Sequence, residues 1–277
     1  MRKPVKIIAL DLDGTLLNSD KKLTQGNLEA LERAAAAGIH IVPTTGRFYG
    51  GMPDFIRRLP FVRYVITING AQVADLQTGQ VIYRAELPVN QTVELMKYLD
   101  TLPVIYDCYM NNDAFMTEAL KERVDEMVSS PHYRKMVREL RKPVPELKQF
   151  ILQQGNDIQK VQFFTNQPQL RLELMEQLPR QFDNIIVSSS VVDNVEINQS
   201  RANKGEALLA LAAHLGVDRE QTMSFGDGLN DLSMIRDAGI GVAMANACPE
   251  VKELADELTL SCDEDGVAHG INRLCFS

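Results

Sequence analysis

Short apolar segments alternate with longer amphipathic ones in this chain, and this alternation restricts the fold more than any other feature. Residues 5–10 are apolar and β-branched, and the run is too short for a helix, so it predicts a buried strand. The same reasoning gives strands at 39–43 and 64–68, with helices at 25–38 and 48–58 between them. Strands joined by helices predict right-handed crossovers and a parallel sheet covered on both faces.

The alternation resumes at residue 204 and continues to the end of the chain. Strands are expected at 221–225, 239–244 and 256–260, with helices at 204–215, 229–237 and 249–255 and after Gly266. A chain that leaves this pattern and returns to it predicts one sheet built from two separate pieces.

The middle of the chain does not follow the pattern. It comes after a predicted hairpin turned at Thr78-Gly79, and its charged part over 111–157 is expected to be mostly helical. We therefore expect an α/β fold, in which a Rossmann-like, doubly wound parallel sheet forms the core. Residues 1–82 and 191–277 would form this core, and residues 83–190 would be an inserted α/β cap that carries substrate specificity.

Composition excludes several classes of function. The formal net charge is −8 and no dense Lys/Arg tract occurs, which argues against a nucleic-acid-binding protein. The apolar run near the N-terminus stops at Asp11, and no stretch approaches the roughly 20 apolar residues of a membrane span. The four cysteines form no metal-binding pattern and fit reduced thiols. These features predict a cytoplasmic protein without membrane partners. Nothing in the sequence requires an oligomer, so a monomer or weak homodimer is expected.

Four polar clusters fall at predicted strand ends or at a helix start. Ligands of open parallel sheets bind beyond the carboxyl ends of the strands. Each cluster alone fits ordinary turn or capping chemistry, but four clusters along one sheet edge favour a binding site. They are Asp11-Leu12-Asp13-Gly14-Thr15, Thr44-Thr45-Gly46-Arg47, Asn203-Lys204-Gly205 and Gly226-Asp227-Gly228-Leu229-Asn230-Asp231.

The aspartates of these clusters indicate a metal site. Asp11, Asp13, Asp227 and Asp231 would bring four negative charges into one crevice, which is unfavourable without a cation. Oxygen ligands without His or Cys favour Mg²⁺ over zinc. A neighbouring Lys204 would suit a phosphate group, and a carboxylate beside a metal and a phosphate is a candidate nucleophile.

The clusters resemble the four motifs of the haloacid dehalogenase superfamily of phosphotransferases. The resemblance is strongest to Cof-type phosphatases, in which a large α/β cap is inserted between the second and third motifs. It covers roughly 5–82 and 195–274, whereas the cap is similar only in position and in its strand and helix alternation. The matching segments are "LDLDGTLL", "TTGR", "NGA", "NKGEAL", "GDGLNDLSMI" and "GVAMANA".

The resemblance implies a role for each acidic residue. Asp11 would attack phosphorus and become an aspartyl-phosphate. Asp13 would protonate the leaving oxygen and then activate water, while its backbone carbonyl binds Mg²⁺. Asp11 and Asp227 would bind the ion through their side chains, and Asp231 would act on it from outside the direct ligands. Thr15 would help to fix the Asp13 carboxyl group.

The resemblance also implies a cradle for the transferring phosphoryl group. It would consist of the side chains of Thr45, Lys204 and Asn230, and of the backbone amides of Leu12 and Gly46.

The sequence therefore predicts a Mg²⁺-dependent phosphatase for a small phosphorylated metabolite, such as a sugar phosphate or a phosphorylated cofactor. A proton donor at Asp13 argues against the dehalogenase and ion-pump branches of the superfamily, because its proton transfer is worth roughly 10²–10⁴-fold in rate. The alternatives are a phosphomutase of the same superfamily and a non-catalytic protein that binds a phosphorylated metabolite.

Other polar residues carry weaker indications. Arg47 and Asn69 follow strands and fit either a structural role or a substrate contact. The four histidines stand apart from the clusters and are expected to be structural or on the surface. Candidates in the cap fit either a sugar ring or the core and its rim: Tyr106, Asp107, Tyr109, Asn111 and Asn112.

Overall fold

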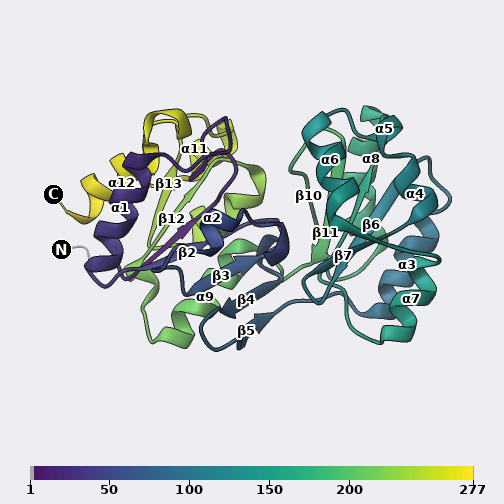
Figure 1. The fold of residues 1–277 in the computed structure, drawn as a ribbon, viewed down its shortest axis with the longest axis horizontal. Coiled ribbons are helices and arrows are strands. Elements are labelled where there is room, and N and C mark those ends of the chain that lie inside the picture. Colours follow the sequence, from purple (N-terminus) through teal and green to yellow (C-terminus); the bar gives the residue numbers. More distant parts are fainter. Residues whose placement is uncertain (1–2, 277) are drawn as a thin grey trace. The chain divides into compact units, whose positions relative to one another are not determined.

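A computed structural model describes residues 3–276 of the 277-residue chain, which form two compact units (Figure 1). The first unit contains the chain up to Gly46, Met52–Arg84 and the residues from Asn203 on. The second contains Arg47–Gly51 and Ala85–Ala202. The chain thus returns to the first unit later than residue 190, where the sequence pattern placed the boundary, because strand β11 (Asn194–Gln199) pairs within the second unit.

A five-stranded parallel sheet forms the centre of the first unit, in the order β14-β13-β12-β1-β2. Strand β2, which follows β1 in the sequence, lies on one side of β1, and the later strands β12, β13 and β14 lie on the other. The direction in which successive strands are added to the sheet therefore reverses between β1 and β12. The predicted fold class is confirmed. The strands are β1 (Ile7–Leu10), β2 (His40–Pro43), β12 (Thr222–Gly226), β13 (Ile240–Ala243) and β14 (Glu257–Leu258).

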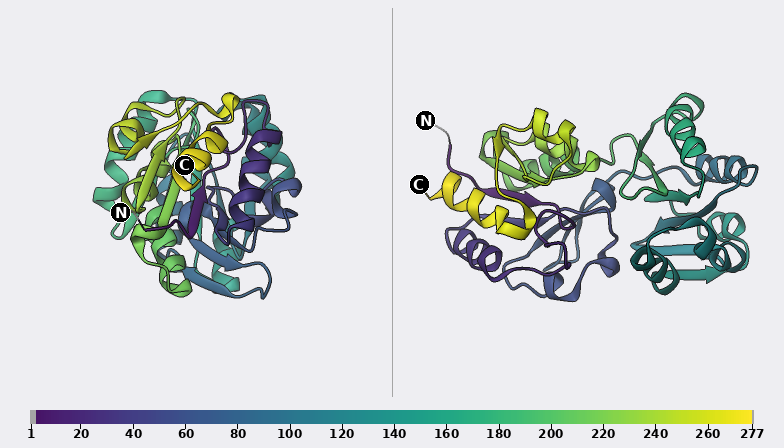
Figure 2. Two further views of the ribbon diagram at one scale, coloured as in Figure 1. Left: turned by 90° about the vertical axis from the view of Figure 1, so that its left-hand side faces the viewer. Right: turned by 90° about the horizontal axis from the view of Figure 1, so that it is seen from above.

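Helices cover both faces of this sheet, which is why β1 is buried along its whole length. Ile7 and Ala9 face a cluster formed with α9 and α10, while α12 packs on the other face, with Gly270 against the Phe225 ring. Figure 2 shows the C-terminal helix α12 beside α1. The helices are α1 (Gln25–Ala36), α9 (Lys204–Leu215), α10 (Leu232–Asp237), α11 (Pro249–Leu254) and α12 (Gly266–Cys275).

A small antiparallel sheet extends this unit beside β2. It consists of β3 (Tyr64–Thr67), β4 (Gln72–Asp75) and β5 (Val81–Arg84), and the predicted hairpin at Thr78-Gly79 joins the last two. A parallel bridge between Thr44 and Ile66 connects β3 to the end of β2.

The helix predicted over 48–58 is wrong in its extent. The structure has a short 3₁₀ turn, η1 (Tyr49–Gly51), and then the four-residue helix α2 (Asp54–Arg57). Pro53 separates them, since proline lacks an N–H for the helical ladder and disfavours the helical conformation of the residue before it.

The second unit contains a six-stranded sheet in the order β10-β11-β9-β6-β7-β8. One of its faces packs on the helices α3, α7 and α8 through an apolar cluster that includes Leu95, Ile151, Phe163 and Leu174. The helices are α3 (Val89–Leu99), α4 (Glu118–Glu122), α5 (Val124–Met127), α6 (Pro131–Leu140), α7 (Leu147–Gln154) and α8 (Pro168–Gln181). The strands are β6 (Ile105–Met110), β7 (Asp113–Thr117), β8 (Arg141–Val144), β9 (Lys160–Phe164), β10 (Ile185–Ser188) and β11.

The mostly helical character predicted for 111–157 needs correction, because two strands, β7 and β8, occur in it. Pro143 lies within β8. Since β8 is an edge strand, a residue without an N–H is tolerated there.

Within residues 3–276, none of the helices has both the length and the apolar character that a membrane crossing requires. All four cysteines are free thiols.

We expect Leu211→Ala to lower the free energy of unfolding by about 2–5 kcal/mol, because this α9 side chain is fully buried against the sheet. Leu172→Ala is the control, since Leu172 in α8 is 52% exposed. The chain has no Trp, so urea unfolding would be followed by circular dichroism. Equal losses in the two variants would contradict the assignment of Leu211 to the core.

Candidate active site

The carboxyl edge of the parallel sheet gathers residues of all four polar clusters in the first unit, whereas Arg47, the last residue of the second cluster, belongs to the second unit. Asp11 follows β1, Asp227 follows the adjacent β12, and Thr45 follows β2 on the other side. Lys204 is the first residue of α9, and Asn230 lies in the 3₁₀ turn η4 (Leu229–Asp231). Because β1 and β12 are neighbours at the point where the strand order reverses, their ends meet in the crevice where α/β sheets bind ligands.

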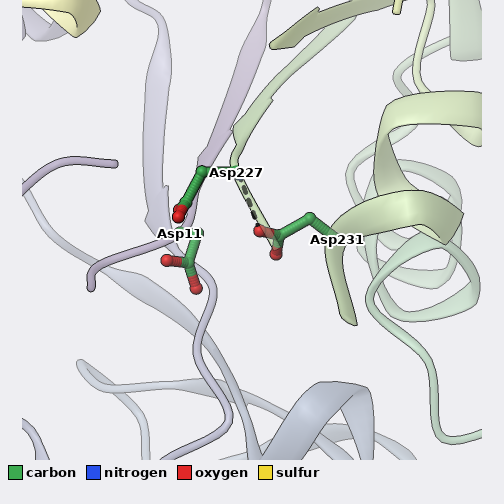
Figure 3. Close-up of side chains that lie close together, drawn as sticks. All are labelled: Asp11, Asp227 and Asp231. Carbon is green, nitrogen blue, oxygen red and sulfur yellow. Dashed lines mark hydrogen bonds between the residues drawn. The ribbon is translucent and has the colours of Figure 1, made fainter. Parts of the chain in front are cut away.

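Three carboxylates converge at this edge. Asp11, Asp227 and Asp231 each offer an oxygen within 4.8 Å of the others (Figure 3). Asp231 is positioned by the backbone, since its Oδ2 accepts hydrogen bonds from the amides of Asp227 and Gly228, each at 2.9 Å. All three donors are carboxylate oxygens, which fits Mg²⁺.

Burial and mutual repulsion raise the pKa of two of these carboxyl groups. Burial, followed by the charge of Asp231, raises the pKa of Asp227 to about 6. For Asp11, burial is again the largest cause and raises its pKa well above the usual range, although the Lys204 ammonium acts in the opposite direction. The structure therefore brings together more negative charge than the site favours, and a divalent cation would relieve this repulsion.

Lys204 supplies positive charge to the group. Its side chain is completely buried, and its Nζ donates to Asp11 Oδ1 and Asp231 Oδ1, both at 2.5 Å. Burial lowers the pKa of Lys204, but the two carboxylates outweigh it and hold the pKa above its ordinary value. The lysine that the sequence placed at a helix start is thus a permanent cation inside the site.

Asp13 lies apart from the three converging carboxylates. Its side chain is 32% exposed, and Lys21 Nζ is 3.1 Å from its Oδ1. No sequence pattern indicated Lys21, which is eight positions away in an irregular segment. Thr15 also differs from expectation, because its hydroxyl donates to Asp227 Oδ1 at 2.6 Å, and not to Asp13.

The predicted phosphate-binding residues lie around the same edge. Thr45 is 2% exposed, and its amide donates to Ile66 O at 2.9 Å. Asn230 Nδ2 donates to Asn69 Oδ1 at 3.3 Å, which brings the weak candidate Asn69 to the site. Leu12 is fully buried directly after Asp11.

The cap candidates take part in contacts inside the second unit. Asp107 accepts from Arg141 Nε and from Gln162 Nε2, both at 2.9 Å, and the Tyr109 hydroxyl accepts from Arg141 at 2.8 Å. Tyr106 belongs to the apolar cluster under the helices. Asn111 and Asn112 form the tight turn between β6 and β7, with φ of 53° and 60°.

The remaining weak candidates have structural contacts. Arg47 donates to Gly51 O at 3.1 Å. His40 packs edge-on against Tyr64, His269 hydrogen-bonds Thr259, and His132 and His214 are exposed. The structure thus places the four histidines as expected, away from the carboxylates.

Comparison with known families gives a match over most of the chain. Residues 8–271 match the haloacid dehalogenase-like hydrolase family. The chain belongs to this family. The resemblance that the sequence motifs indicated is therefore confirmed.

Curated proteins and solved structures agree with this assignment. The chain is 30% identical to phosphatase YwpJ of Bacillus subtilis, over 98% of this chain and all of that protein. It is 29% identical to the 5-amino-6-(5-phospho-D-ribitylamino)uracil phosphatase YcsE of Bacillus subtilis, over 97% of this chain and 95% of the relative. A haloacid dehalogenase-like hydrolase structure from B. subtilis superimposes with a TM-score of 0.85 at 28% identity, covering 98% of this chain and all of that one.

Without divalent cations, stability should fall as the pH rises from about 4 to 6. The folded state keeps the Asp227 proton up to about pH 6, whereas an unfolded Asp loses it near 3.8, so the stabilisation from the bound proton is lost across this window. A displacement of about two pKa units corresponds to at most about 3 kcal/mol. Asp227→Asn should flatten the slope.

This pH dependence would be measured by urea unfolding in EDTA. Asp183→Asn is the control, since Asp183 is exposed and lies in the second unit. An unchanged slope in Asp227→Asn would show that this carboxyl group is not the one that titrates.

Proposed function

We propose that this protein is a Mg²⁺-dependent phosphatase that hydrolyses small phosphorylated metabolites through an aspartyl-phosphate. The observation that carries the proposal is the buried Asp11 carboxylate, which lies 2.5 Å from the Lys204 ammonium and converges with Asp227 and Asp231. This arrangement joins a nucleophile to groups that attract both a cation and a phosphate. The names of the relatives support the reaction, and that of YcsE supports a small phosphorylated substrate.

The ion would be held by the side chains of Asp11 and Asp227 and by the backbone carbonyl of Asp13, with Asp231 outside the direct ligands. When bound, Mg²⁺ would offset the negative charge of the carboxylates and of the phosphoryl oxygens.

Asp11 and Asp13 would divide the covalent chemistry. A carboxylate oxygen of Asp11 forms a bond to phosphorus as the bond to the leaving oxygen breaks, and that oxygen takes the proton of Asp13. Asp13, now ionised, accepts a proton from water, whose oxygen attacks phosphorus and releases Asp11 and inorganic phosphate. The partial exposure of Asp13 fits this role, because the group must reach the leaving group and water.

The phosphoryl group would be held from several sides. Lys204, Thr45 and Asn230 would bind its oxygens through their side chains, and the amides of Leu12 and Gly46 would bind them through the backbone. Donors fixed in advance by a folded sheet edge stabilise charge that develops in the transition state.

The overall charge agrees with a small-molecule substrate. With a net charge of −8, attraction to a polyanion such as nucleic acid is disfavoured. The cytoplasmic location and the monomeric or weakly dimeric state stay predictions from the sequence.

We expect Asp11→Asn to abolish the release of inorganic phosphate from p-nitrophenyl phosphate in the presence of Mg²⁺, because an amide cannot act as the nucleophile. Circular dichroism would establish that the variant is folded, and Asp183→Asn should retain full activity. Undiminished hydrolysis by Asp11→Asn would overturn the nucleophile. If the wild-type protein were given a sugar phosphate and isomerised it without releasing inorganic phosphate, the result would instead indicate a phosphomutase.

Mg²⁺ should raise the melting temperature of the wild-type protein, since a ligand that binds only the folded state stabilises it by mass action. At 100 times the dissociation constant the gain is about 2.7 kcal/mol. Asp227→Asn should lose most of this gain, whereas Asp183→Asn should keep it. The readout is a thermal melt at several Mg²⁺ concentrations, and an equal shift in all three proteins would contradict the assigned site.

A further inference from the structure

An unusual turn, η2 (Ile68–Gly70), follows strand β3 at the edge of the site. Its three residues all have positive φ, of 54°, 55° and 95°. The left-handed conformation is rare for a β-branched residue such as Ile68. Strain of this kind persists only where the surroundings enforce it, and it gathers at functional sites.

The turn touches the predicted phosphate loop after β2. The amide of Asn69 donates to Thr45 O at 3.0 Å. Gly46 lies so near that a Cβ added to it would stand 2.6 Å from Asn69 Oδ1. The backbone of Asn69 is therefore bonded to the Thr45-Gly46 segment, and its side chain lies directly against Gly46.

The turn also packs on the start of α9. A Cβ added to Gly70 would lie 2.3 Å from the carbonyl oxygen of Asn203 and 3.0 Å from the amide nitrogen of Lys204. The helix that presents Lys204 thus begins in direct contact with the turn.

The third contact is to Asn230. Its Nδ2 donates to Asn69 Oδ1 at 3.3 Å, and a side-chain amide carries two N–H groups. One N–H directed to Asn69 fixes the orientation of the amide and leaves the second to be presented elsewhere. Asn69 is 4% exposed, so its own position is set by the fold.

We infer that Asn69 is a positioning residue whose side chain orients Asn230 toward the transferring phosphoryl group. Its backbone amide separately holds the Thr45-Gly46 segment. The inference rests on the proposed phosphatase function for the identity of that group. Asn suits this position because it tolerates the left-handed conformation and carries an acceptor for Asn230.

A double-mutant cycle tests the coupling. Asn69→Gly keeps the backbone conformation accessible and removes the acceptor. We expect Asn69→Gly and Asn230→Ala each to raise the inhibition constant of inorganic phosphate about tenfold, measured against p-nitrophenyl phosphate hydrolysis. The double variant should lose no more than Asn230→Ala alone, because the same contact is already gone.

Asn69→Asp provides a second test of the coupling, since Asp also tolerates this φ and keeps an acceptor for Asn230. In that background, Asn230→Ala should weaken phosphate binding by the same factor as in the wild type. Both proteins in this comparison carry the new carboxylate, so its repulsion of phosphate cancels. This test can be made even if Asn69→Gly fails to fold.

Asn184→Gly is the matched control, because Asn184 has nearly the same φ, 56°, but is exposed in the second unit. It should leave the inhibition constant unchanged. The inference would be overturned if the inhibition constant of the Asn69→Gly/Asn230→Ala variant rose by the product of the two single factors. It would also be overturned if Asn69→Gly raised the inhibition constant no more than the control does. If the wild type releases no phosphate, the proposed function fails, and calorimetric binding of inorganic phosphate to the same proteins still measures the coupling.

Discussion

The buried ammonium of Lys204 holds two carboxylates together at the carboxyl edge of the first unit. It contacts Asp11 and Asp231, and both carboxylates are more than nine-tenths buried. Carboxylates at this depth cost several kcal/mol each unless they are paired and hydrogen-bonded. Since Lys204 opens α9 and Asp11 ends β1, one interaction links two segments that are 193 positions apart in the chain.

The reversal of strand order determines where this charge can collect. The neighbours β1 and β12 come from the two ends of the sequence, so Asp11 and Asp227 meet only after the sheet has formed. The insertion of Ala85–Ala202 between them does not disturb the sheet, because it folds around a sheet and an apolar cluster of its own.

Several features of the site oppose stability. Burial and repulsion raise the pKa of Asp11 and Asp227, and the turn Ile68–Gly70 holds a left-handed conformation. Native proteins keep such features where function requires them and compensate for them elsewhere. The fully apolar β1 and its covering helices bury Ile7 and Leu10 completely and so add stability to the same unit.

The sequence by itself determined the parallel sheet, the helix over 204–215 and the clusters at strand ends, because apolar periodicity and capping are local properties. It did not determine that β7 and β8 are strands, since their charged residues and Pro143 obscure the pattern and edge position is a tertiary property. Only the tertiary structure decided that Thr15 bonds Asp227, that Lys21 reaches Asp13 and that Asn69 supports Asn230. Such pairings depend on distances through space, and residues up to 212 positions apart become neighbours only when the sheet is complete.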